Sequence, residues 1–228
     1  MKPQAISFDL DGTLVDTAVE IAEAANRTLV EFGLPRRPLA QIRLLIGRGS
    51  HALMSALLEH ARAEAGDDCT LDEAWLLKRF DSHYADTTGE LSAPYAGAHE
   101  TLELLREHGL GLACVTNKEF MHARRLLHRH GLHRHFELLV GGDSLPWPKP
   151  DGRVLRTVAQ AMGVPRASLV HVGDSAIDVE AARNAGVRAW ALPHGYNAGR
   201  PIAEAEPDAL LPDLMSVVQA SGVGHPHA

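Results

Sequence analysis

Apolar positions follow two different periods along this chain, and the change of period divides it into two parts. Between residue 17 and about residue 90, apolar residues recur every three or four positions, which predicts amphipathic helices and no strand. We expect helices from Asp16 or Thr17 to about Phe32, Leu39 to Ile46, His51 to Ala65 and Leu71 to about Thr87, with a loop at 66–68. This stretch is a helical insertion.

Elsewhere, short apolar runs alternate with helical patterns. We expect strands at Ala5–Phe8, Leu110–Val115, Leu138–Val140, Leu169–Val172, Val187–Leu192 and Ala209–Leu211. Helices are expected at His99–His108, Phe120–His130, Gly152–Met162, Ile177–Asn184 and Pro212–Gln219, before a loose tail from Ser221. Strands that alternate with helices predict an α/β fold with a doubly wound parallel sheet, a Rossmann-like core. The predicted core comprises residues 1–16 and 91–228, and residues 17–90 form a second, helical domain.

Composition narrows the class of protein. The 228 residues are 45% hydrophobic and carry a formal charge of −7, which argues against nucleic acid or an anionic membrane as partner. No apolar run approaches the roughly 18 residues of a membrane span. The two cysteines, Cys69 and Cys114, form no disulfide pattern or metal-binding motif, and no signal peptide precedes the first strand, so we expect a cytoplasmic protein.

The first predicted strand ends in two acids, Asp9 and Asp11, followed by Gly12 and Thr13. In an open α/β sheet, ligands bind outside the carboxyl ends of the strands. Two carboxylates there repel each other unless a cation or a shared proton offsets them, and Mg²⁺ is suited to such oxygen ligands. A carboxylate also acts as a nucleophile in some phosphoryl transfers. The alternative is an ordinary Asp-Gly turn.

Polar groups follow other predicted strands. Thr116 comes directly after one, Asp174 after another, and Asp178 four residues later. Lys149 lies between two prolines, which hold it on a stiff, extended segment. Each has a plain alternative as a helix cap or an exposed loop residue, but the doubly wound topology brings all of these ends to one edge.

These motifs together resemble the haloacid dehalogenase-like phosphatase superfamily, in the right order and across the whole chain. The matching stretches are Asp9 to Asp16, Thr116, Lys149, and Gly173 to Asp178. The resemblance implies that the helical insertion is the superfamily's α-helical cap. Within the superfamily, Ile46-Gly47-Arg48-Gly49, Asp174 to Gly186 and His194-Gly195-Tyr196-Asn197 resemble bacterial phosphoglycolate phosphatases.

The resemblance implies a Mg²⁺-dependent phosphomonoester hydrolase that acts on a small phosphorylated substrate, most simply 2-phosphoglycolate. Asp9 would attack phosphorus to form an aspartyl-phosphate, and Asp11 would protonate the leaving alcohol and then activate water. The Asp9 side chain, the Asp11 backbone carbonyl and Asp174 would hold Mg²⁺. Thr116, Asn117 and Lys149 would bind the phosphoryl group, and Asp178 would orient its neighbours without touching the metal.

Substrate choice is assigned to the cap. Arg48, between two glycines, is the candidate for binding a substrate carboxylate or for a contact across the cleft, with an exposed turn residue as the alternative. His194 stands where the family pattern often carries a Tyr, and surface packing is the expected role. The protein is expected to be a monomer or a homodimer.

Several alternatives stay open at this point. The same core residues serve a sugar phosphomutase, or a phosphatase for another small ester, a nucleotide or pyrophosphate. A phosphate-binding regulatory protein on the same fold is the non-enzymatic alternative. A hydrolytic dehalogenase or a phosphonate hydrolase is disfavoured, because neither needs Asp11.

Overall fold

The computed structural model describes residues 2–65 and 72–223. The predictions of a loop at 66–68 and a loose C-terminal tail fall wholly or largely outside the described residues, as does Cys69. Among the described residues, no helix is long and apolar enough to cross a membrane.

Six parallel strands form the central sheet, in the order β5-β4-β1-β6-β7-β8. They are β1 (Ala5–Phe8), β4 (Gly111–Val115), β5 (Leu138–Val140), β6 (Leu169–Gly173), β7 (Arg188–Ala191) and β8 (Ala209–Leu210). Strand β1 pairs with β4 on one side and β6 on the other, with Phe8 level with Cys114 and Val172. The predicted doubly wound parallel sheet is therefore confirmed. When the six strands are numbered by their order along the chain, their order in the sheet is 3-2-1-4-5-6. This order reverses between β1 and β6, and a crevice forms at the carboxyl ends of these two strands.

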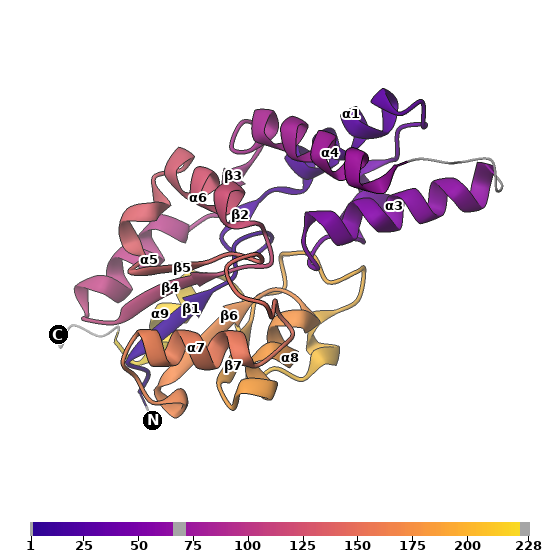
Figure 1. The fold of residues 1–228 in the computed structure, drawn as a ribbon. Coiled ribbons are helices and arrows are strands. Elements are labelled where there is room, and N and C mark those ends of the chain that lie inside the picture. The colour runs from indigo at the N-terminus through magenta and orange to yellow at the C-terminus, as the bar shows by residue number, and fades with distance from the viewer. Residues whose placement is uncertain (1, 66–71, 224–228) are drawn as a thin grey trace.

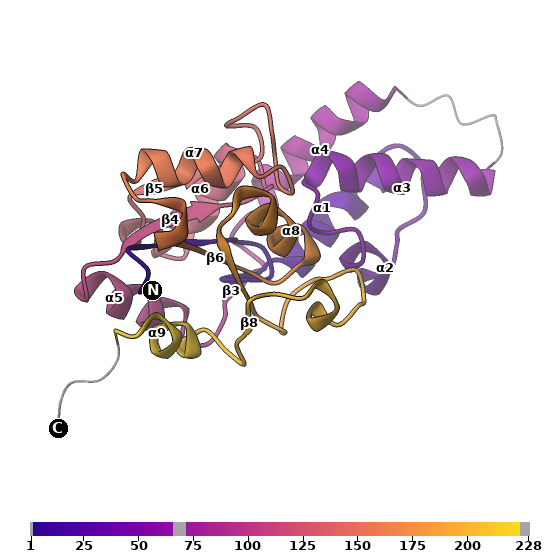
Figure 2. The same ribbon diagram turned by 90° about the horizontal axis from the view of Figure 1, so that it is seen from below.

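Helices cover both faces of this sheet (Figure 1). One face packs against α5 (Ala98–Glu107), α6 (Phe120–Arg129) and α9 (Met215–Ser221), and the other against α7 (Arg153–Ala161) and α8 (Ala176–Ala185). Figure 2 shows α7 on one side of the strands and α5 and α9 on the other. Short 3-10 helices lie at Leu132–His135, Arg166–Ser168 and Ile202–Ala205.

Among its described residues, the segment from residue 17 to residue 90 contains helices and no strand. They are α1 (Ala18–Glu31), α2 (Leu39–Arg43), α3 (Ser50–Ala65) and α4 (Glu73–Thr87). Their apolar sides, including Leu29, Leu57 and Phe80, form a core of their own. In Figure 1 these helices lie together, to one side of the sheet.

Several boundaries differ from the sequence prediction. Helix α2 ends at Arg43 rather than Ile46, because the chain enters turns at 44–47, and Ser221, predicted to begin the tail, still belongs to α9. A two-stranded antiparallel ribbon, β2 (Val15–Asp16) with β3 (Ala93–Pro94), joins the chain where it enters and leaves the helical segment. Two residues are too short to show a period, so the pattern did not reveal it. The last helix begins at Met215 rather than Pro212, because the Asp213 carboxylate accepts hydrogen bonds from the Ser216 backbone N–H and hydroxyl.

Candidate active site

Asp9 lies at the carboxyl end of β1, at the crevice where the sheet reverses direction. Its backbone N–H donates to the Val172 carbonyl at 2.9 Å, which continues the pairing with β6. The chain then turns sharply, because Gly12 has φ of +83° and the Leu10 carbonyl accepts bonds from the N–H groups of residues 13–15. The turn leaves Asp9 8% exposed.

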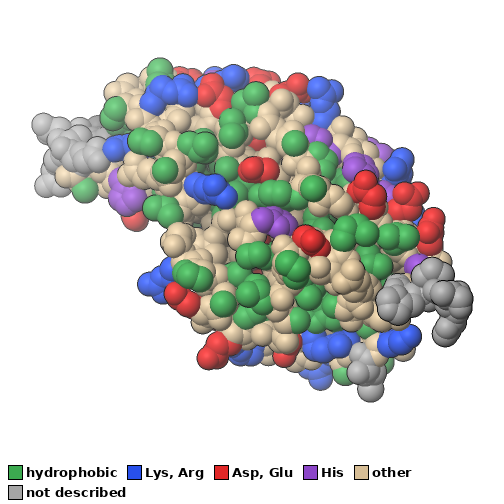
Figure 3. Space-filling view, turned by 180° about the vertical axis from the view of Figure 1, so that it is seen from behind, with side chains coloured by type: hydrophobic (Ala, Val, Ile, Leu, Met, Phe, Trp, Pro, Cys, Tyr) green, Lys and Arg blue, Asp and Glu red, His purple; other side chains and the backbone are tan. Residues whose placement is uncertain are grey.

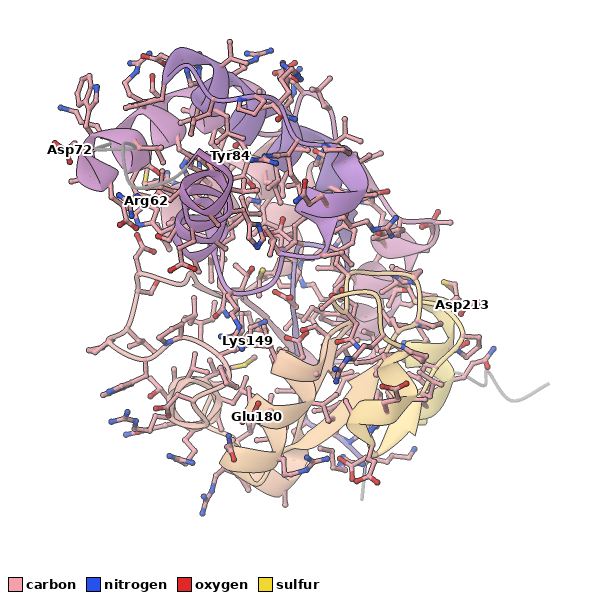
Figure 4. All side chains as sticks on the ribbon, turned by 90° about the vertical axis from the view of Figure 1, so that its right-hand side faces the viewer. Arg62, Asp72, Tyr84, Lys149, Glu180 and Asp213 are labelled. Carbon is pink, nitrogen blue, oxygen red and sulfur yellow. The ribbon has the colours of Figure 1, made fainter. Side chains whose placement is uncertain are left out.

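Lys149 lies between Asp9 and Asp178. Its Nζ is 2.9 Å from Asp9 Oδ1 and 2.6 Å from Asp178 Oδ1, and all three side chains are buried. Burial acts to lower the pKa of Lys149, but the two carboxylates raise it above its ordinary value, so the ammonium stays charged. In Figure 4, Lys149 lies below the helices of the 17–90 segment, toward the ends of the strands.

Asp178 has no acceptor position left for a metal. Its Oδ1 takes bonds from Lys149 Nζ and His171 Nε2, and its Oδ2 takes bonds from the Ser175 backbone N–H and hydroxyl. A carboxylate offers about four such positions. Burial alone would raise the pKa of Asp178, but Lys149 and His171 hold it below its ordinary value.

Asp174 follows β6 and accepts one hydrogen bond on each oxygen. The donors are the Thr13 hydroxyl and the Tyr196 backbone N–H, both at 2.6 Å. Burial and the charges of Asp178 and Asp9 raise the pKa of Asp174 well above its ordinary value. Glycines at 12 and 195 permit this close approach, since a Cβ at either would overlap the Asp174 carboxylate.

Asp9, Asp174 and Asp178 form the group of potential metal ligands that is found among the described residues, with ligand oxygens within 4.8 Å of one another. Burial and the neighbouring acids raise the pKa of Asp9 to about 6, even though Lys149 opposes the shift. The group therefore carries more negative charge than Lys149 offsets. Because Asp178 is saturated, the free acceptor positions of Asp9 and Asp174 are those that fit a cation, and carboxylate oxygens suit a hard one.

Asp11 is bonded away from that group. Its Oδ1 accepts from the Thr17 hydroxyl and from Lys118 Nζ, each at 2.8 Å. Lys118 also contacts the hydroxyl of Tyr84, a residue of α4, and its Nζ lies 4.6 Å from the centre of the Tyr84 ring. Sequence reasoning missed Lys118, although it directly follows Thr116 and Asn117. No local pattern signals Tyr84.

Thr116 and Asn117 follow β4 as predicted. The Thr116 backbone N–H donates to the Val140 carbonyl at 3.0 Å, and Thr116 lines the same cavity as Asp9. The Asn117 amide bonds both the N–H and the carbonyl of Lys149 and also reaches the Gly47 carbonyl, at 2.9 to 3.0 Å. This amide therefore positions the Lys149 backbone and joins it to the helical segment.

His171 extends the buried network behind Lys149. Its Nε2 is 3.1 Å from Asp178 Oδ1 and its Nδ1 is 2.9 Å from the Ser7 hydroxyl. Burial lowers the pKa of His171, so the ring is neutral, and a proton on Nε2 satisfies both contacts. Sequence reasoning missed His171. The signal in the sequence that could have revealed it was its position as a single polar residue within the apolar strand β6.

Neither Arg48 nor His194 is among the described residues that line the cavity of the two N-terminal acids. Arg48 is exposed, and it does not line the cavity that holds Asp9 and Asp11. His194 packs its ring 4.1 Å from that of Tyr95, and its Nε2 is 3.1 Å from the Thr13 carbonyl oxygen.

The neighbouring Tyr196 joins the sheet to the first helix of the insertion. Its hydroxyl contacts Asp16 and accepts from the N–H groups of Thr17 and Ala18, which lie at the start of α1. Tyr196 therefore fixes where the helical segment leaves the sheet.

Comparison with known proteins decides the family, because the model of the haloacid dehalogenase-like hydrolases matches residues 6–192. The chain belongs to this family. A phosphoglycolate phosphatase of Cupriavidus necator is 42% identical over 210 residues, which cover 92% of this chain and 89% of the relative. One from Pseudomonas syringae pv. tomato is 39% identical over 216 residues, or 95% of this chain and 79% of the relative.

A solved structure supports the same grouping. The crystal structure of a predicted phosphoglycolate phosphatase from Haemophilus somnus matches with a TM-score of 0.93 and 32% identity, over 97% of this chain and 99% of that one. The predicted family and the predicted phosphomonoester hydrolase activity are thus confirmed.

Proposed function

We propose that this protein is a Mg²⁺-dependent phosphatase that hydrolyses 2-phosphoglycolate to glycolate and phosphate in the cytoplasm. The observation that carries the chemistry is the separation of the two N-terminal acids. Asp9 lies with Asp174 and Lys149, whereas Asp11 is bonded to Thr17 and Lys118. Different surroundings let one acid stay ionised as the nucleophile while the other gains and loses a proton as the general acid and base.

Asp9 is the nucleophile in this proposal. Its carboxylate oxygen attacks phosphorus, the bond from phosphorus to the ester oxygen breaks, and an aspartyl-phosphate forms. Lys149 holds the Asp9 oxygen and places a positive charge beside the transferred oxygens, with Thr116 as a further donor. Asp178 and His171 fix the Lys149 ammonium from behind.

Asp11 is the acid and base. It donates a proton to the leaving oxygen of glycolate and then takes a proton from the water that hydrolyses the aspartyl-phosphate. Asp9, Asp174 and the Asp11 backbone carbonyl would hold Mg²⁺, which when bound supplies positive charge that offsets the charge between nucleophile and phosphate.

The helical segment is proposed as a cap that limits the size of the leaving group. Ile21, Ile46 and Leu53 from this segment line the cavity with Asp9 and Asp11. The cavity has a volume of about 30 Å³. On the same scale, one ordered water needs roughly 10–15 Å³. A leaving group of a few atoms, such as glycolate, suits this space better than a nucleoside.

A phosphate-release assay tests the proposal. The panel comprises 2-phosphoglycolate, sugar phosphates, nucleotides and pyrophosphate, each with Mg²⁺ and with a chelator, and with Asp9→Asn as control. We expect release from 2-phosphoglycolate above the other esters, only with the metal and only with Asp9. Equal rates in wild type and Asp9→Asn would refute the mechanism. Equal rates on many esters would refute the substrate.

One buried oxygen without a partner favours a second candidate substrate, a small polyol phosphate or sugar phosphate. Glu119 Oε1 accepts from the Ser50 hydroxyl at 2.6 Å, but its Oε2 is buried and has no partner among the described residues. A hydroxyl on the leaving group would satisfy it. Glu119→Gln should then slow sugar phosphates while sparing 2-phosphoglycolate. A loss on both alike would remove this candidate.

A further inference from the structure

We propose that Lys118 binds the carboxylate of the leaving group and so determines the substrate. The inference rests on the proposed function, and it assigns to Lys118 a role that the sequence had assigned to Arg48. It follows from where a carboxylate must lie relative to the general acid.

The substrate itself limits that position. In 2-phosphoglycolate a single carbon separates the ester oxygen from the carboxylate group. The general acid must come within about 2.6–3.2 Å of the ester oxygen to protonate it. A group that binds the carboxylate must therefore lie beside Asp11, on the side away from the transferred phosphoryl group.

Lys118 occupies that position. Its Nζ lies 2.8 Å from Asp11 Oδ1, and its side chain lines the same cavity as Asp9, Asp11 and Thr116. Among the described residues that line this cavity, Lys118 is the only cation. The other lysine of the site, Lys149, is held between Asp9 and Asp178 and serves the phosphoryl group.

The Lys118 ammonium also retains a donor for a ligand. An ammonium carries three N–H donors. Two have partners among the described residues, the Asp11 carboxylate and the Tyr84 hydroxyl. The third is left for an oxygen in the cavity, so the carboxylate can bind while Asp11 keeps its contact.

The surroundings make this charge effective. The Lys118 side chain is 1% exposed, and Tyr84 contacts its Nζ through the hydroxyl, with the centre of the Tyr84 ring 4.6 Å away. With water excluded, the attraction between an ammonium and a carboxylate is much stronger than at the surface. Tyr84 comes from the helical segment (Figure 4), so this contact exists only when that segment lies against the sheet.

Arg48 is placed differently, although its loop lies close by. The Asn117 amide bonds the Gly47 carbonyl at 3.0 Å, which brings the backbone of this loop to the site. The exposed Arg48 side chain instead lines two neighbouring cavities, one beside Ser175 and one beside His122. A guanidinium in those cavities lies outside the space that receives the leaving group.

The test compares substrates that differ only in the carboxylate. Phosphate release from 2-phosphoglycolate and from ethyl phosphate is measured for wild type, Lys118→Met and Lys118→Gln, and the ratio of the two kcat/KM values is taken. Any effect on Asp11 acts on both substrates and leaves this ratio unchanged. Hydrogen bonds to charged groups contribute about 1.5–3 kcal/mol, so we expect the ratio to fall roughly 10- to 100-fold.

Binding without turnover provides a second readout. Calorimetry with 3-phosphonopropionate and propylphosphonate, which differ in the same way and cannot release phosphate, should show the same loss of preference in Lys118→Met. Lys118→Arg, which keeps the positive charge, should keep part of the preference. Lys78→Met is the matched control, because Lys78 is exposed and lies over Trp75, outside the cavity.

The outcomes separate the two proposals. Absence of phosphate release from 2-phosphoglycolate in wild type would refute the proposed function, and the phosphonate pair would still decide the role of Lys118. An active wild type whose Lys118 variants lose both substrates by one factor would overturn this inference. So would a loss of preference in Arg48→Met but in neither Lys118 variant.

Discussion

Replacing the nucleophile Asp9 by Asn should stabilise the metal-free protein while abolishing its activity. Asp9 is 8% exposed and lies among Asp174, Asp178 and a single ammonium. Burial, together with the charges of Asp178 and Asp11, raises the pKa of Asp9 from its ordinary value of 3.8 to about 6. A buried carboxylate whose pKa is raised is a source of instability wherever it is ionised.

The sign and size follow from proton linkage. The folded state binds the proton of Asp9 more tightly than the unfolded state does. Asp9 therefore costs no stability below pH 3.8, and the free energy of unfolding falls as the pH rises through about 6. A shift of about two pKa units corresponds to roughly 3 kcal/mol above pH 6. Asn carries no charge, so Asp9→Asn should recover most of this, or about 6–10 °C in Tm for a chain of this length.

Thermal unfolding with a chelator present, at pH 4 and at pH 7.5, measures the effect. We expect Asp9→Asn to unfold at higher temperature than wild type at pH 7.5 and to match it at pH 4. Glu180→Gln is the control, because Glu180 is exposed on α8, and neutralising it should change neither (Figure 4). An Asp9→Asn protein that is less stable at pH 7.5, or equally stabilised at both pH values, would refute the reasoning.

Three further outcomes are expected. Lys149→Met should lower the free energy of unfolding by about 3–5 kcal/mol at pH 7, because it leaves the buried carboxylates of Asp9 and Asp178 unpaired. Urea unfolding measures this change, and an unchanged midpoint would contradict it. Added Mg²⁺ should raise the Tm of wild type more at pH 7.5 than at pH 5, because protons compete for Asp9, and an effect independent of pH would argue against that ligand. Gly195→Ala should weaken Mg²⁺ binding at least tenfold in a calorimetric titration, because the added Cβ displaces the Asp174 carboxylate. An unchanged affinity for Mg²⁺ would show that Asp174 is not a ligand.

The surface adds little to these expectations. On the face that Figure 3 shows, acidic and basic side chains lie interspersed with apolar ones rather than gathered by sign. The charges that matter for the proposed reaction are the buried ones that follow strands β1, β4, β5 and β6, among them Asp9, Lys118, Lys149 and Asp174.

Periodicity in the sequence was sufficient for most of the fold, because each long element repeats its own pattern. Every predicted strand is present, and the helices at 18–31 and 120–129 end within a few residues of their predicted bounds. The ribbon at 15–16 and 93–94 was missed because its strands are two residues long. It is the distant partner strand, and not the local pattern, that makes them strands.

The sequence by itself determined which groups stand at the carboxyl ends of the strands, Asp9, Thr116 and Asp174, because each follows its own apolar run. A parallel sheet then brings such ends together whatever the details. Only the tertiary structure decided what each group contacts. Lys118 meets Asp11 across 107 positions of sequence and contacts Tyr84 from another part of the chain, whereas Arg48 does not line the cavity. The first contact depends on the pairing of β1 with β4 and the second on how the helical segment lies against the sheet, and no local pattern records either.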